Sequence, residues 1–265
     1  MAGGAEPVPE AVEILSPLTE VEFPDEWYGL TTGDHFWFEW RLLAALRQVG
    51  AVGLSTTAAL SALEVGSGTG VLRDQLEAAT RWTIDITDLS LKALKDSRRG
   101  RGRALYYDVL ERRPELQEAY DVVILYDVLE HVAPTRPFVD AVLAHLKPGG
   151  FLLLNVPALQ ALHGAYDEAA GHHRRYDRTT LAAEFAGTSL QILDLRYWGF
   201  LLLPALVLRR AVQKRGRDAK DTIRSGFRRP GPLVHAGLRA LMRLELGLAL
   251  APLGTSLLLA GRKRA

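Results

Sequence analysis

The sequence contains no cysteine, almost no net charge and no long uncharged run. Without cysteine, disulfides, thiolate metal sites and a cysteine nucleophile are excluded. The 32 Lys and Arg residues nearly balance the 31 Asp and Glu residues, so a formal net charge of +1 provides no overall field that would gather nucleic acid. The longest uncharged apolar stretch, 246–261, contains Pro252 and Gly254 and is shorter than the roughly 20 residues of a membrane-spanning helix. We expect it to be a helix end followed by a buried strand.

The chain is long enough for one sizeable domain. Its 265 residues, 48% of them hydrophobic, predict a single α/β domain with a small appended subdomain and exclude a disordered or fibrous chain. The start carries Glu6, Glu10 and Glu13 where a secretory signal would carry basic residues and an apolar run, so a cytoplasmic location is expected.

Charge is distributed unevenly along the chain. Residues 1–40 hold nine acidic and no basic residues, whereas 209–229 hold nine basic and two acidic ones. Two interpretations stay open. In the first, the acidic block is a solvated arm and the basic block is a solvated linker. In the second, the basic block binds an anionic partner.

The centre of the chain alternates short apolar runs with amphipathic segments. The runs predict strands, and helices lie between most of them. This alternation predicts a doubly wound, mostly parallel sheet of seven strands, with ligands at the carboxyl ends of the strands. Residues 1–20 are expected to form a loose arm. The predicted strands are 62–65, 82–87, 104–107, 121–126, 151–156, 190–195 and 255–260, and the predicted helices include 71–79, 89–97 and 136–146.

A glycine-rich turn follows the first of these central strands. Glu64 to Gly70 reads E-V-G-S-G-T-G, and a helix is predicted to begin at Val71, where free N–H groups would face a polar ligand. Val71 replaces the last glycine of the dinucleotide fingerprint G-x-G-x-x-G. The turn also lacks the Lys and Ser or Thr of a phosphate-binding loop. The spacing therefore disfavours both of those sites.

Five consecutive features resemble the class I S-adenosylmethionine-dependent methyltransferases, which have a Rossmann-like fold. They are the glycine turn, TDLSLKAL from Thr87, YDV from Tyr107, YDVVILYDVLEHV from Tyr120 and LKPGGFLLLNVP from Leu146. Five features in this order are far more specific than any one alone. The segment GHHRRY from Gly171 is similar to a stretch in the branch that includes quinone-biosynthesis methyltransferases.

The resemblance implies S-adenosylmethionine as cofactor and assigns roles to residues of this chain. Asp88 would bind the ribose hydroxyls, with Asp85 as the alternative, and Asp108 would bind the adenine amino group unless it only caps a turn. Backbone at Tyr126 and Asp127 would meet the methionine end. The full set of predicted cofactor contacts is Glu64, Gly66, Ser67, Gly68, Gly70, Asp88, Leu89, Asp108, Val109 and Tyr126.

Methylation of an oxygen or carbon requires loss of a proton, and histidine is the natural base near neutral pH. The candidates are His131 after the fourth central strand and His172 and His173 after the fifth. Two alternatives remain. His131 only anchors a loop, or the enzyme has no general base. No metal ligand is predicted.

The N-terminal aromatic segment is predicted to form a helical lid over the cofactor and acceptor. Trp37 and Arg41 are candidate acceptor contacts, Arg41 through a carboxylate, and Tyr176 is a third. The alternative is that the aromatic side chains simply pack on the sheet. The segment 197–253 is predicted to be a helical insertion before the last strand that serves as a cap, a homodimer surface or a peripheral membrane contact through 200–229.

We therefore expect a lid in 1–50, a cofactor-binding core in 51–196, an insertion in 197–253 and the last strand in 254–265. The predicted activity is methyl transfer to a small or medium, apolar or aromatic acceptor, with O-methylation favoured over C-methylation. A nucleic-acid acceptor is disfavoured, because Tyr126 to Leu129 replaces the tetrapeptide of base-methylating enzymes. The alternatives are an NAD(P)-dependent oxidoreductase and a non-catalytic cofactor-binding scaffold.

Overall fold

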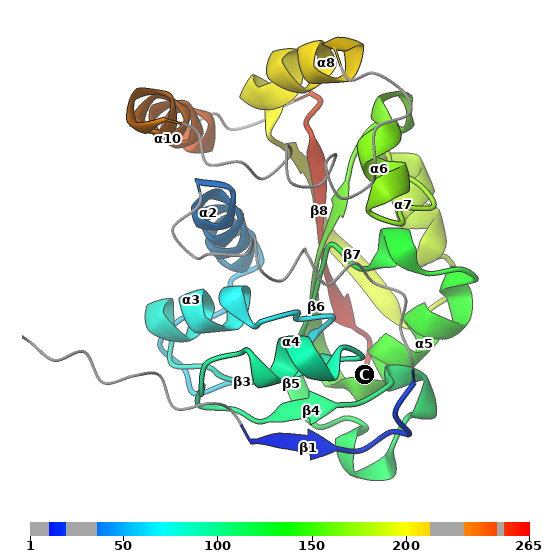
Figure 1. Ribbon diagram of the computed structural model, residues 1–265. Helices are drawn as coiled ribbons and strands as arrows, with labels where there is room; N and C mark the ends of the chain where they lie inside the picture. The colour runs from blue at the N-terminus through cyan, green and yellow to red at the C-terminus, as the bar shows by residue number, and fades with distance from the viewer. Residues whose placement is uncertain (1–10, 20–35, 213–230, 248–251) are drawn as a thin grey trace, which may run out of the picture.

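A computed structural model describes residues 11–19, 36–212, 231–247 and 252–265, and its described part is built on one sheet with helices on both faces (Figure 1). The strand order is β1-β4-β3-β2-β5-β6-β8-β7. All neighbours from β1 to β6 are parallel, and β8 runs antiparallel to both β6 and β7. The strands are β1 (Val12–Ile14), β2 (Ser61–Val65), β3 (Thr83–Asp88), β4 (Ala104–Tyr106), β5 (Tyr120–Tyr126), β6 (Leu146–Pro157), β7 (Leu190–Trp198) and β8 (Ser256–Lys263).

This architecture confirms the predicted doubly wound α/β fold but corrects the strand count from seven to eight. The additional strand β1 lies in the segment expected to be a loose arm. Val12, Glu13 and Ile14 pair with β4 at the edge of the sheet, and the N–H groups of Leu15 and Ser16 continue the contact by donating to the carbonyl of Tyr106. Edge pairing through backbone groups requires no periodic apolar pattern, which is why the sequence does not reveal it.

Helices cover the sheet on two sides (Figure 1). Apolar side chains of α2, α3 and α10 pack on one face, and those of α5 and α7 pack on the other. Both faces are buried because the strands are nearly continuous apolar runs, as expected for a parallel sheet. The helices are α2 (Phe36–Ala51), α3 (Val71–Ala79), α4 (Leu91–Lys95), α5 (Thr135–His145), α6 (Ala165–Ala169), α7 (Arg178–Glu184), α8 (Leu203–Val212) and α10 (Pro232–Gly247).

The connection from β7 to β8 carries α8 and α10, as predicted for a helical insertion before the last strand. Its anchor is Glu245 of α10, a buried carboxylate that accepts hydrogen bonds from the N–H groups of Gly199, Phe200 and Leu201. These N–H groups begin the 3-10 turn η5 (Phe200–Leu202) and would otherwise lack partners. Most of the basic block lies in 213–230, outside the described residues.

The strand order reverses between β2 and β5, because the chain builds β3 and β4 on one side of β2 and places β5 and β6 on the other. Ligands of doubly wound sheets bind at the carboxyl ends of the strands beside this point. The loops after β2, β3, β4 and β5 meet there. In the part of the chain that the structure describes, none of the helices has the length and apolar character needed to cross a membrane.

Candidate functional site

The glycine turn, residues 66–70, connects β2 to α3. Gly66, Gly68 and Gly70 all have positive φ, at 69°, 55° and 70°. A Cβ on Gly66 would lie 2.4 Å from Cγ2 of Val128, so a larger residue is excluded there by space as well as by backbone conformation. Two N–H groups, of Gly66 and Ser67, donate to the carbonyl of Thr87 and hold the turn against the end of β3.

Asp88 stands at the end of β3 and ties the glycine turn to the following loop. Its Oδ2 accepts from the N–H of Gly68 at 2.7 Å, and its Oδ1 accepts from the N–H of Ser90 at 2.8 Å. Burial raises the pKa of Asp88, and these backbone hydrogen bonds oppose that effect. Each oxygen retains acceptor capacity for a ligand hydroxyl.

The alternative carboxylate, Asp85, is committed to a different network. Its side chain accepts from the backbone N–H and guanidinium of Arg103 and from the hydroxyl of Tyr120. The Arg103 guanidinium lies 2.7 Å away and Asp85 is buried within β3. This saturation gives Asp85 a structural role, and the geometry favours Asp88 as the ribose ligand.

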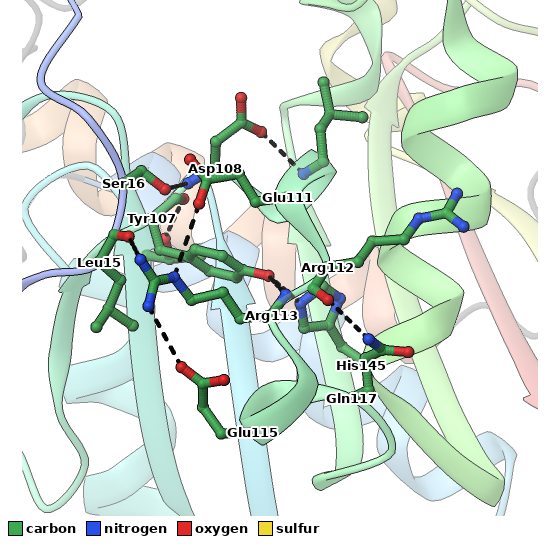
Figure 2. A network of polar contacts seen from close by, with 12 residues as sticks. Leu15, Ser16, Tyr107, Asp108, Glu111, Arg112, Arg113, Glu115, Gln117 and His145 are labelled. Carbon is green, nitrogen blue, oxygen red and sulfur yellow. Dashed lines mark hydrogen bonds and ion pairs between the residues drawn. The ribbon is translucent and has the colours of Figure 1, made fainter.

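Asp108 follows β4 and caps the 3-10 turn η1 (Val109–Glu111), which is the alternative that the sequence left open. Its Oδ1 accepts from the N–H of Leu110 at 2.9 Å, and its own N–H donates to the hydroxyl of Ser16 at 2.9 Å. Figure 2 shows this contact beside Tyr107, whose hydroxyl lies 2.9 Å from Nε2 of His145. Val109 is buried next to them. The second carboxylate oxygen of Asp108 leaves an adenine contact compatible with the cap.

The end of β5 carries a strained residue. Asp127 has a φ of 60°, which is uncommon for a residue other than glycine and often marks a functional site. Its carboxylate accepts from Arg41 Nη1 at 3.0 Å and from Asn155 Nδ2, and Asn155 in turn accepts from the indole of Trp198. This chain of contacts joins α2, β5, β6 and β7. The sequence predicted a role for Arg41 but gave no sign of these partners.

Two buried groups of opposite charge beside the glycine turn have unused hydrogen-bonding atoms. Neither Oε2 of Glu64 nor Nε of Arg41 has a partner among the described residues. Burial raises the pKa of Glu64 to about 7, against the opposing charges of Arg41 and Arg73. A buried polar atom without a hydrogen-bond partner is costly unless a ligand supplies one. These two atoms therefore suit a ligand that carries both an ammonium and a carboxylate.

Tyr126 and Trp37 lie on the same side of the sheet as Arg41 but are packed against protein groups. The hydroxyl of Tyr126 donates to Oε1 of Gln48 at 2.7 Å, and the Trp37 ring stacks on Trp198 at 5.2 Å. Trp37 thus follows the packing alternative, although its side chain stays partly exposed. Of the predicted lid, residues 36–50 form most of α2 and the aromatic residues before Phe36 lie outside the described residues.

Tyr176 is corrected from an acceptor contact to a core residue. It is 1% exposed, belongs to the apolar cluster under α5 and α7, and forms an isolated bridge with Ala158. Its hydroxyl donates to Glu184 at 3.4 Å. The Tyr176 side chain therefore packs in the core, where the backbone bridge to Ala158 places it.

The structure brings two of the three predicted histidines together. The rings of His131 and His172 lie 4.7 Å apart and meet edge to face, beside the carboxylate of Glu130. We call Glu130, His131 and His172 the histidine cluster. His173 is adjacent in sequence, but it is exposed, and its backbone N–H donates to the carbonyl of Glu130. Glu130 is a residue that the sequence interpretation missed.

Each member of the histidine cluster has a distinct electrostatic state. Burial, with the charges of His172 and His173, lowers the pKa of His131 to about 4, so that ring is neutral at pH 7 and weakly basic. Burial and the Asp127 carboxylate raise the pKa of Glu130 well above its usual range. His172 is held by Asp167, whose Oδ1 lies 2.8 Å from Nδ1 of the ring. Although burial acts in the opposite direction, hydrogen bonds from His172 and Arg175 lower the pKa of Asp167 to about 2.

Residues 63–152, which run from within β2 to within β6 and include the glycine turn, Asp88, Asp108, Asp127 and His131, match the family model of a methyltransferase domain. No curated protein sequence matches the chain.

Solved structures share this fold at low sequence identity. Phosphoethanolamine N-methyltransferase 2 of Haemonchus contortus, in complex with S-adenosyl-L-methionine, is 16% identical over 85% of this chain and 52% of that one, with a TM-score of 0.54. The cyclase SpnF is 19% identical over 89% of this chain and 85% of that one, with a TM-score of 0.57. The 1,6-didemethyltoxoflavin-N1-methyltransferase of Burkholderia thailandensis is 14% identical over 86% and 81%, with a TM-score of 0.50. The family match assigns residues 63–152 to a methyltransferase domain, and the glycine turn and the strand order agree with the Rossmann-like fold of the solved structures.

Proposed function

We propose that this chain transfers the methyl group of S-adenosylmethionine to an oxygen of a small or medium, apolar or aromatic acceptor. The transfer is an in-line displacement at the sulfonium methyl. The protein must therefore align the two partners, exclude water and remove the proton of the attacking hydroxyl.

The observation that carries the cofactor assignment is that two buried atoms beside the glycine turn, Oε2 of Glu64 and Nε of Arg41, have no hydrogen-bond partner among the described residues. The methionine end of S-adenosylmethionine is a zwitterion, and its ammonium and carboxylate complement Oε2 of Glu64 and Nε of Arg41. The positive-φ glycines allow the ligand to approach the backbone closely. Asp88 and Asp108 then stand at successive strand ends, in the order in which the ribose and adenine would follow.

The proposed acceptor side is the loop after β5. Of the three predicted bases, His172 has the geometry of a general base, because the Asp167 carboxylate orients its ring. His131 lies against it as a neutral ring, and the exposed side chain of His173 is separate from the pair. We assign proton removal to His172 and a positioning role to His131.

Apolar surface on the insertion between β7 and β8 supports an apolar substrate. A groove of about 590 Å³ is lined by residues of η5 and α8, namely Phe200, Leu201, Leu203, Pro204, Val207 and Leu208. Val207 and Leu208 are themselves exposed. This surface, next in sequence to the basic block, supports the proposal of a peripheral membrane contact through 200–229. A homodimer surface on the same helices is the competing proposal.

The first test is calorimetric titration of the purified protein with S-adenosylmethionine and S-adenosylhomocysteine, with NAD(H) as the control. We expect micromolar binding of the two sulfur ligands and none of NAD(H). Binding of NAD(H) alone would overturn the proposal in favour of an oxidoreductase.

The second test measures transfer of labelled methyl groups to aromatic acceptors that differ only in bearing a hydroxyl, an amine or a methyl ether. We expect product from the hydroxyl compounds only. Cofactor binding without product from any acceptor would support a non-catalytic scaffold, and the presence of a cyclase among the structural neighbours shows that this fold is not confined to methyl transfer.

A further inference from the structure

The histidine cluster brings together three side chains of the types that bind transition metals. One nitrogen from each of His131 and His172 and one carboxylate oxygen of Glu130 all lie within 4.8 Å of one another. Nε2 of His172 is 3.9 Å from Oε1 of Glu130. The cluster joins the 3-10 turn η3 (Leu129–His131) to the segment after α6, so only the tertiary fold assembles it.

Glu130 has no protein partner for its carboxyl group. The residue is 0% exposed, and neither Oε1 nor Oε2 has a hydrogen-bond partner among the described residues. Buried polar atoms are nearly always paired, and an unpaired carboxyl group in a protein interior costs several kcal/mol. The charge of Asp127 adds to that cost, and the charge of Arg175 offsets part of it. A cation between Glu130 and the two imidazoles would remove that cost.

Hydrogen bonds from neighbouring groups orient the rings of His131 and His172 in the way that is usual for histidines that bind a metal. Nδ1 of His172 faces Asp167 at 2.8 Å, which leaves Nε2 toward Glu130, and Asp167 is fixed in turn by Arg175 at 2.8 Å. His131 is hydrogen-bonded to the backbone of Gly171. A carboxylate or carbonyl on the second ring nitrogen is the usual partner of a histidine that ligates a metal, because it fixes the tautomer and the ring orientation.

We propose that Glu130, His131 and His172 bind one divalent transition-metal ion. Two imidazoles and one carboxylate form a donor set suited to Zn²⁺ and to similar ions such as Co²⁺. Ligand distances near 2.0 to 2.2 Å require the three side chains to draw together on loading by small rotations. Three protein ligands leave a coordination position open, as in catalytic sites. The inference revises the expectation from the sequence that the chain holds no metal ligand.

A role of the ion in methyl transfer rests on the proposed function, whereas binding of the ion does not. An ion at this position would lower the pKa of a coordinated acceptor hydroxyl and stabilise the attacking oxygen. His172 would then serve as a ligand in the loaded protein, and Asp167 would hold it in that role.

The test uses the full chain, treated with a chelator and then titrated with ZnCl₂ by calorimetry and with CoCl₂ by visible absorption. We expect one ion per chain with micromolar or tighter affinity, and a Co²⁺ spectrum that reports nitrogen and oxygen ligands. Wild-type protein that binds neither ion, or binds them with the affinity of an unstructured histidine-containing peptide, would overturn the proposal.

Variants locate the ion. Glu130→Gln and His172→Ala should each weaken Zn²⁺ binding by about 100-fold or more, and Asp167→Asn by about 10- to 100-fold through the orientation of His172. His173→Ala is the matched control, because it removes an adjacent imidazole whose side chain is exposed, and its affinity should equal that of the wild type. Circular dichroism shows which variants remain folded. If His172→Ala does not fold, Glu130→Gln still tests the site, because glutamine keeps the shape of the glutamate side chain. Equal Zn²⁺ affinity in Glu130→Gln and His173→Ala would place the ion elsewhere.

Different outcomes would refute the proposed function and the proposed metal site. Protein that binds Zn²⁺ through this cluster but does not bind S-adenosylmethionine would retain the metal site and refute the function. Protein that binds S-adenosylmethionine and methylates a hydroxyl but binds no ion would refute the metal site alone.

Discussion

The glycine turn and the histidine cluster are assembled from different kinds of contact. The turn is held by backbone hydrogen bonds to Thr87 and Asp88, at the end of the neighbouring strand. The histidine cluster joins side chains from two separate loops, and its Glu130 remains unpaired in the interior. Comparison of the two shows that the glycine turn is held by hydrogen bonds within the protein, whereas the carboxyl group of Glu130 has no hydrogen-bond partner among the described residues.

Replacement of His172 should have the largest effect and should separate the two regions. His172→Ala removes the proposed base, so the rate of methyl transfer should fall about 100-fold or more. The affinity for S-adenosylmethionine should be unchanged, because the residue does not contact the glycine turn. Single-turnover kinetics and calorimetry measure the two quantities. A comparable loss of rate in His173→Ala would show that the exposed ring, and not the buried pair, handles the proton.

Replacement of Glu64 tests whether its buried carboxyl group, of which Oε2 has no hydrogen-bond partner among the described residues, is costly on the cofactor side. Its pKa is about 7 in the folded protein and about 4.5 in the unfolded chain, so the folded state holds the proton more tightly. The stability contributed by the protonated form is therefore present below pH 4.5 and is lost as the pH rises through 7. Glu64→Gln should be more stable than the wild type by about 3 kcal/mol at pH 8, with little difference near pH 4.5.

Urea denaturation of the cofactor-free protein at both pH values measures this difference. Asp177→Asn, which replaces an exposed carboxylate at the start of α7, is the control. Its free energy of unfolding relative to the wild type should not increase between pH 4.5 and pH 8. A constant difference between Glu64→Gln and the wild type at the two pH values would mean that Glu64 is not the titrating group.

Replacement of Asp88 tests the part of the cofactor side that is already hydrogen-bonded within the protein. Asp88→Ala should weaken S-adenosylmethionine binding by about 1 to 3 kcal/mol, because the carboxylate would accept two charge-assisted hydrogen bonds from the ribose. Calorimetry measures the affinity. Asp85→Ala is the matched control, which should lower the stability of the fold through loss of the Arg103 contact and leave the affinity near that of the wild type. The reverse pattern would make Asp85 the ribose ligand.

The smallest effect is expected at the edge of the sheet. Ser16→Ala removes the acceptor for the N–H of Asp108 and should lower the free energy of unfolding by about 1 kcal/mol. Thermal or urea denaturation measures it, with Ser55→Ala in an exposed turn as the comparison. If Ser16→Ala were as stable as the wild type, β1 would contribute little to holding the loop after β4.

Local sequence predicts the cofactor side well. The predicted helix at 71–79 coincides with α3, and the strand before the glycine turn is correct to one residue. The choice between Asp88 and Asp85 depended on matching a family pattern, and the structure supports it by showing that Asp85 is saturated. Whether these residues contact the cofactor stays a prediction. The edge strand β1 could not be predicted, because three residues with mixed polarity carry no periodic signal.

The acceptor side was predicted only as a set of separate residues. His131 and His172 were both candidates, but the sequence does not indicate that their rings meet or that Glu130 lies buried beside them. Tyr176 was assigned to the acceptor because it closes the GHHRRY segment, yet the bridge from Ala158 turns it into the core. Proximity in sequence did not distinguish His172 from His173, whereas burial does.

The sequence by itself determined the alternation of strands and helices, the glycine turn and the acidic residues at the strand ends. It could do so because apolar periodicity and positive-φ positions are properties of neighbouring residues. The tertiary structure alone decided the Arg41 to Asp127 contact, the orientation of His172 by Asp167 and the isolation of Glu130. Those features depend on which loops the sheet order brings to the same edge, and on how much water the packing excludes from them.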